Sequence, residues 1–118
     1  MLTLEEANAL ASNSEATLAT VKEILLALNK WPTQMRPNVS PNGGGVEGMC
    51  LGLVYGLGGQ GLKVSSIAQK HRELTKLISK ACSDSIPGGF DFTSIQINHN
   101  YASKKHCDSN NVGPSWII

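Results

Sequence analysis

A run rich in proline and glycine, residues 32–45, divides this sequence into unequal parts. The run contains three prolines and ends in three consecutive glycines. Proline lacks a backbone N–H and glycine loses the most conformational freedom on folding, so this composition predicts a linker without regular structure. We therefore expect a helical N-terminal segment (residues 1–31), the linker, and a C-terminal part (residues 46–118).

The N-terminal segment has the pattern of an amphipathic helix over residues 3–30. Thr3 and Glu6 have the spacing of a capping box. The apolar residues that recur at intervals of three and four are Leu18, Val21, Leu25 and Leu28. The run from Ser12 to Ser14 has side chains that compete with the backbone for hydrogen bonds. One long helix and two shorter helices are therefore both compatible with this segment.

The C-terminal part begins with the pattern of a β-hairpin followed by a helix. Residues 46–55 are apolar and partly alternating, residues 56–61 are rich in glycine, and residues 62–64 are suited to a second strand. Ser65 or Ser66 can cap a helix that ends before residue 85. The apolar residues that share one stripe of this helix are Ile67, Leu74, Leu77, Ile78 and Ala81.

Strand patterns return in the last thirty residues. Residues 90–101 alternate and predict a half-buried strand, with Gln96, Asn98 and Asn100 on its polar face. Residues 116–118 resemble the start of a further strand and are followed by no turn or cap. We therefore expect this chain to be a fragment.

Size, charge and cysteine content exclude several classes of protein. The chain has 118 residues, enough for one modest domain, and its net charge of +1 indicates no general attraction to nucleic acid or membrane. No run approaches 18 apolar residues, and four acids lie in the first thirty residues, so we expect an intracellular, soluble protein without a membrane partner. The spacing of Cys50, Cys82 and Cys107 favours reduced thiols over a disulfide framework.

Two further motifs have weak functional signals. Residues 56–61 match the G-x-G-x-x-G pattern of nucleotide-binding loops, but the extended pattern after them argues against a phosphate-binding helix terminus. Arg72, Lys76 and Lys80 recur at four-residue steps and form a basic stripe, with Lys63 and Lys70 nearby. This stripe is either a contact for a phosphate backbone or an ordinary solvated helix face.

The strongest chemical signal is the pair formed by His106 and Asp108. On an extended backbone, residues two apart project from the same side about 6.5 Å apart, so the imidazole and the carboxylate can converge on one metal ion. Non-haem iron(II) oxygenases use two histidines and one carboxylate in this way, and the pair supplies two of those three ligands. A zinc site that adds Cys107 is disfavoured because adjacent strand residues point to opposite faces.

The surroundings of this pair resemble a known family. The run FTSIQINHNYASKKHCDSNNVGPSWII, residues 92–118, is similar to the iron-binding region of 2-oxoglutarate- and iron(II)-dependent dioxygenases, in particular TET/JBP-like proteins. The residues that match the shared pattern are Asn98, Asn100, His106, Asp108, Asn110, Asn111, Gly113, Pro114 and Ser115. The resemblance implies an α+β protein in which N-terminal helices pack on a double-stranded β-helix (jelly roll), with residues 46–118 as the first part of that domain.

The resemblance also implies an activity and a set of site residues. It implies an oxidoreductase that hydroxylates its substrate with Fe(II) as cofactor and 2-oxoglutarate as cosubstrate. It assigns His106 and Asp108 to the iron, and the side chains expected to support the cofactor site are Asn98, Asn100, Asn110 and Asn111. The family suggests a nucleic-acid base as substrate, a protein side chain being the alternative. The basic residues that we expect to contact nucleic acid are Arg72, Lys76, Lys80, Lys104 and Lys105.

The same resemblance predicts that this chain is inactive as given. In the family, a second iron-binding histidine and a basic residue for 2-oxoglutarate lie on later strands. His71 and His99 are the only other histidines here, and we expect both to be structural. The rival interpretation is therefore a non-catalytic binding module whose basic helix contacts an anionic partner.

Overall fold

Helices and strands are interleaved along the part of the chain that the structure, a computed structural model, describes: residues 1–36, 40–41, 44–55, 61–100 and 115–118. In chain order they are α1 (Leu4–Ala11), α2 (Leu18–Leu26), β1 (Thr33–Met35), β2 (Gly45–Tyr55), β3 (Leu62–Val64), α3 (Ser66–Lys70), α4 (Arg72–Ser85) and β4 (Ser94–His99). In these residues the strands form one antiparallel sheet of four, which confirms the α+β class.

The N-terminal segment forms two helices rather than one. The predicted capping box is present, since Thr3 Oγ1 accepts from the Glu6 N–H (3.1 Å) and Glu6 Oε1 accepts from the Thr3 N–H (3.0 Å). After α1, the Ser14 hydroxyl donates to the Leu10 carbonyl (2.7 Å). Helix α2 then starts from Thr17, whose Oγ1 accepts from the Thr20 N–H. Side chains that hydrogen-bond to backbone groups between α1 and α2 therefore divide the N-terminal segment into two helices.

Strand β2 is the partner of every other strand. It pairs with β1 in the register Thr33↔Glu47, with β3 in the register Leu53↔Val64, and with β4 in the register Met49↔Ile97. The predicted hairpin is thus confirmed. Our expectation that residues 32–45 lack regular structure is wrong for β1 and for Gly45, the first residue of β2. The prolines of this run flank residues 33–35 without occupying them, so all three residues keep the N–H groups that a strand needs.

The predicted second helix is broken at His71. That residue has φ −124° and ψ 65°, outside the helical region, and separates α3 from α4. Its side chain is buried, as expected for a structural histidine. The Asn8 side chain of α1 accepts from the Leu74 N–H (2.9 Å), which satisfies a donor in the first turn of α4. A contact from a distant helix therefore supports the break.

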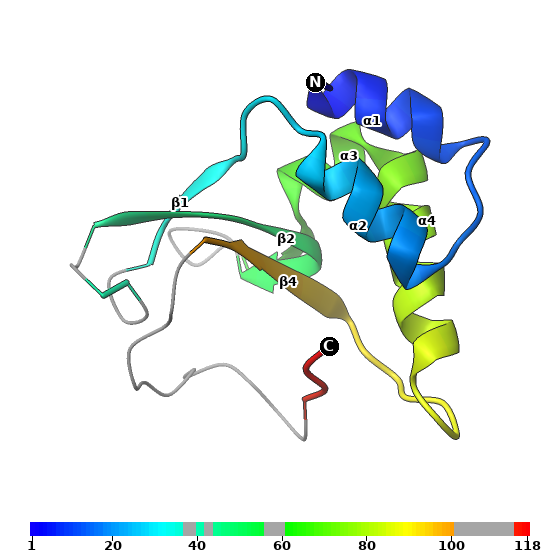
Figure 1. Ribbon diagram of the computed structural model, residues 1–118. Coiled ribbons are helices and arrows are strands. Elements are labelled where there is room, and N and C mark those ends of the chain that lie inside the picture. The colour runs from blue at the N-terminus through cyan, green and yellow to red at the C-terminus, as the bar shows by residue number, and fades with distance from the viewer. Residues whose placement is uncertain (37–39, 42–43, 56–60, 101–114) are drawn as a thin grey trace.

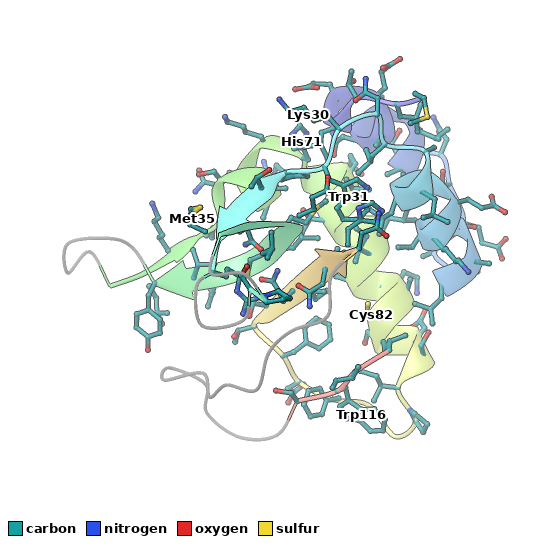
Figure 2. The ribbon with its side chains drawn as sticks, turned by 60° about the vertical axis from the view of Figure 1, so that its left-hand side comes forward. Lys30, Trp31, Met35, His71, Cys82 and Trp116 are labelled. Atoms are coloured by element: carbon teal, nitrogen blue, oxygen red, sulfur yellow. The ribbon has the colours of Figure 1, made fainter. Side chains whose placement is uncertain are left out.

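Strand β4 is shorter than the predicted strand over residues 90–101. Its residues alternate between exposed and half-buried, as expected, but Asn100 has φ 55° and ends the strand. The strand expected at residues 116–118 is absent from the described chain, and our expectation there is wrong. Instead the Trp116 ring packs edge-on against Phe90, with ring centroids 6.2 Å apart, beside the segment that leads from α4 to β4 (Figure 2).

One hydrophobic core joins the helices to a single face of the sheet. Figure 1 shows α1, α2 and α4 gathered on one side of β2 and β4. The largest fully buried apolar side chains of this core are Met49, Leu51, Leu74 and Ile78. None of the helices in the described part of the chain has the length and apolar character that crossing a lipid bilayer requires.

Candidate functional site

The predicted iron ligands, His106 and Asp108, lie outside the described residues. The same is true of Cys107 and of the expected supporting residues Asn110, Asn111, Lys104 and Lys105. Within the described ranges, histidine, cysteine, aspartate and glutamate side chains form no group of three that could hold a metal ion. β4 is the described strand that precedes these residues in the chain.

Three amide side chains meet on the face of the sheet that the helices leave open; we call them the amide cluster. It consists of Gln34 of β1 with Gln96 and Asn98 of β4. Gln96 Nε2 donates to Gln34 Oε1 (2.7 Å) and to Asn98 Oδ1 (3.1 Å). Gln96 and Asn98 are exposed. Two of the amides were expected on this face, whereas Gln34 was missed because its segment had been assigned to the linker.

Gly48 forms the floor beneath the amide cluster. It lies opposite Asn98 in the β2–β4 register. A Cβ added at Gly48 would lie 2.6 Å from the Ile97 carbonyl oxygen, 3.1 Å from Gln34 Oε1 and 3.3 Å from Gln96 Nε2. A side chain at this position would therefore collide with the sheet and with the amide cluster. The glycine lets the amides lie close to the backbone.

Asn100 has surroundings different from those of Asn98. We expected both on one polar face, but the φ of 55° at Asn100 interrupts the alternation after His99. Asn100 instead lines an open hollow of about 350 Å³ with Ser40, Glu47 and His99. The short polar side chain of asparagine tolerates this left-handed conformation better than most residues do. Strand periodicity alone could not predict the turn.

His99 makes two contacts of a structural kind, as the sequence predicted. Its ring stacks on Trp31 with centroids 4.2 Å apart, and its Nδ1 lies 3.0 Å from Glu47 Oε1. Glu47 is also its partner in the β2–β4 register. Figure 2 shows Trp31 between the sheet and the helices. These contacts hold the last residue of β4 against Trp31 and Glu47. The sequence segment that contains the predicted iron ligands follows β4 in the chain.

The cysteines in the described chain, Cys50 and Cys82, are free thiols, as expected. Burial raises the pKa of the Cys50 thiol, while the nearby Arg36 charge and a hydrogen bond with Ser94 act in the opposite direction. Burial also raises the pKa of Cys82. Both side chains are therefore protonated at neutral pH, and neither has the low pKa that marks a reactive nucleophile.

The basic stripe of α4 is partly neutralised. Lys80 Nζ lies 2.9 Å from Asp84 Oδ2, and Lys76 Nζ lies 3.6 Å from Glu73 Oε1. All of these side chains are substantially exposed to solvent, so each pair contributes little to stability. The pairing nevertheless lowers the positive potential along the stripe. Arg72 is the member that makes no ion pair among the described residues.

Comparisons of the chain with protein-family models, with curated proteins and with solved structures find no match. The features of this chain that bear on its function are therefore the motif over residues 92–118 and the amide cluster on the sheet face opposite the described helices.

Proposed function

We propose that this chain carries the iron-binding segment of a TET/JBP-like 2-oxoglutarate- and iron(II)-dependent dioxygenase. The single observation that best supports the proposal is the amide cluster. It joins β1 to β4, the last described strand before His106 and Asp108 in the sequence, and it lies on the sheet face opposite the described helices of the core. Gln96 and Asn98 are exposed, and amide side chains supply both the donors and the acceptors that a polar ligand needs.

The proposal includes a jelly-roll architecture. A jelly roll consists of two sheets packed face to face, so each sheet has one inner face. In this chain the helices cover one face of the sheet, while the opposite face carries Gly48 and the amide cluster. In the proposed architecture, that open face is the inner face, and the helices are the outer layer.

The residues proposed to hold the metal have suitable donor chemistry. An imidazole and a carboxylate, supplied by His106 and Asp108, are two of the three protein ligands of a facial triad for non-haem iron(II). Bound iron would supply oxygen activation for hydroxylation of the substrate. The amides of Asn98, Asn100, Asn110 and Asn111 would orient the ligands and the cosubstrate through hydrogen bonds.

Paramagnetic NMR tests the metal site in this chain directly. We expect Mn(II), as a stand-in for Fe(II), to broaden the amide signals around residues 106–108 and, on the proposed arrangement, that of Asn98. The affinity should be weak because His106 and Asp108 are two of the three ligands of a facial triad. His106→Ala and Asp108→Ala should each abolish the broadening. Asp91→Ala removes an exposed acid outside the motif and is the control. Unchanged broadening in both ligand variants would refute the assignment.

Turnover tests the activity itself. The protein expressed from its own gene should form succinate from 2-oxoglutarate in the presence of Fe(II) and oxygen. His106→Ala and Asp108→Ala should each lower that rate at least about a hundredfold, since the metal is required for the chemical step. Succinate formation that is equal in the wild type and both variants would defeat the proposal.

The proposed substrate is a nucleic-acid base, as the family resemblance implies. An enzyme acting on a base takes it out of the helical stack, and neighbouring positive charge then holds the phosphate backbone. Arg72 is the best-placed group of the basic stripe for such a contact, because it has no acidic partner among the described residues.

A further inference from the structure

One edge of β2 is interrupted between β1 and β3. On this edge the Gly48 N–H donates to the Pro32 carbonyl (2.9 Å), and the Gly52 carbonyl accepts from the Ser65 N–H (2.7 Å). Backbone groups of alternate strand residues point to the same edge, so the N–H and C=O of Cys50 also point there. The pairing of β1 ends at Glu47 and that of β3 begins at Leu53, so no described strand lies opposite Cys50.

The interruption opens a hollow of about 240 Å³, which we call the β2 notch. Its lining includes Gln34 from β1, Cys50 from β2, Lys63 from β3 and Ser66 from α3. No acid lines it among the described residues, Lys63 is the charged residue of its lining, and the charge of Arg36 acts on Cys50 from outside that lining. The volume is below the usual range for drug-sized ligands, which favours a small or narrow occupant.

We propose that the β2 notch binds the C-terminal end of an extended peptide. The Cys50 N–H and C=O would hydrogen-bond to the peptide backbone, as in strand addition to a sheet edge. Lys63 would pair with the terminal carboxylate. Lys63 lies opposite Val54, which is C-terminal to Cys50 on β2. A peptide bound at Cys50 therefore directs its C-terminal carboxylate towards Lys63 when it runs parallel to β2.

Charge favours an occupant with a free carboxylate, and size argues against a stable dimer of this chain. A free C-terminus carries the negative charge that complements Lys63, and a peptide strand would pair with the backbone groups of Cys50, opposite which no described strand lies on this edge. A stable dimer buries about 800 Å² on each partner, which a notch between two three-residue strands cannot supply. The inference goes beyond the proposed oxygenase activity and needs neither iron nor 2-oxoglutarate.

Peptide titration of the intact chain tests this inference. The probes are an acetylated tetrapeptide of alternating threonine and valine with a free carboxylate, and the same peptide ending in a carboxamide. We expect the free acid to bind about 1.4- to fivefold more tightly, the range of an exposed ion pair. The Cys50 amide signal should shift and become protected from hydrogen exchange on binding.

Lys63→Ala should make the two peptides bind equally, while Lys70→Ala, which removes the same charge outside the notch, should preserve the preference for the acid. Equal binding of acid and amide to the wild type would overturn the proposal. So would saturable binding without a shift at Cys50, or no binding at millimolar peptide. Because no metal is added, these outcomes are independent of the test of the iron site.

Discussion

The imidazole of His99 lies flat against the indole of Trp31, with the ring centroids 4.2 Å apart and the ring planes 3° from parallel. Trp31 belongs to the connection between α2 and β1, and only 7% of its surface is exposed. His99 is the last residue of β4. The stack therefore attaches the N-terminal helical segment to the strand that leads towards the predicted iron ligands.

Removing this stack should destabilise the fold. We expect Trp31→Ala to lower the free energy of unfolding by about 3–5 kcal/mol, because a large buried ring leaves a cavity. His99→Ala should cost less, and the double variant should reveal a coupling energy of about 0.5–1.5 kcal/mol between the rings. Urea denaturation followed by circular dichroism measures all three, with exposed Asn29→Ala as control. Strictly additive effects would contradict a direct ring interaction.

An alanine at Gly48 should disturb the amide cluster. Its Cβ would meet the Ile97 carbonyl and Gln34 Oε1. We expect a loss of about 1–3 kcal/mol in the free energy of unfolding, the usual cost of overpacking. The side-chain amide signals of Gln34 and Gln96 should shift in NMR spectra.

Gly88→Ala is the comparison for this variant. Gly88 has φ +76° and open space around its Cβ position, so an alanine there strains the backbone without meeting other atoms. It should lower stability but leave the amide signals of Gln34 and Gln96 in place. If both variants moved those signals equally, Gly48 would not be the floor of the cluster.

The capping box predicts a pH dependence. Hydrogen bonds from the Thr3 backbone and side chain lower the pKa of Glu6 below its ordinary value of 4.5. Because the folded pKa is lower than the unfolded one, the stabilisation is present above pH 4.5 and is lost as the pH falls through the folded value. NMR titration of the Glu6 carboxyl measures this pKa directly.

In the wild type, the urea denaturation midpoint should fall between pH 7 and pH 3, in part because Glu6 becomes protonated. Glu6→Gln should make this fall smaller. Glu5→Gln changes an exposed acid in the same turn that takes no part in the box. An acid sensitivity unchanged by Glu6→Gln would show that the carboxylate has no such role.

The basic stripe makes a separate prediction about nucleic-acid binding. We expect Arg72→Ala to weaken binding to a single-stranded oligonucleotide more than Lys80→Ala does, because Asp84 already pairs with Lys80. Loss of one phosphate contact should also reduce the slope of log affinity against log salt concentration by about 1. A filter-binding salt series measures both quantities. Binding that is insensitive to both variants would assign the stripe to an ordinary solvated helix face.

Local patterns predicted the elements whose signals lie within a few residues. The capping box at Thr3 and Glu6, the hairpin of β2 and β3, and the alternation of β4 all depend on neighbouring side chains. The prediction that His99 is structural was also local, because its position in the alternation put it beside Ile97. These features are confirmed.

Contacts between distant segments account for what the sequence left undetermined. β1 is a strand because β2 supplies its backbone hydrogen-bond partners. The helix break at His71 is supported by the hydrogen bond between the Asn8 side chain and the Leu74 N–H, which are 66 residues apart in the chain. Gln34 joins the amide cluster through Gln96, 62 residues away. No pattern of neighbouring residues in the sequence predicts any of these long-range contacts. The iron ligands lie outside the described residues and stay a prediction.

The position of β2 means that damage to the sheet cannot remain local. Among the described strands, β1, β3 and β4 pair with β2 and not with one another. Single strands are not stable in water, so loss of β2 would leave each of them without support. The sheet must therefore assemble and dissolve as one cooperative unit, and a backbone change in β2 is transmitted to both of its edges at once.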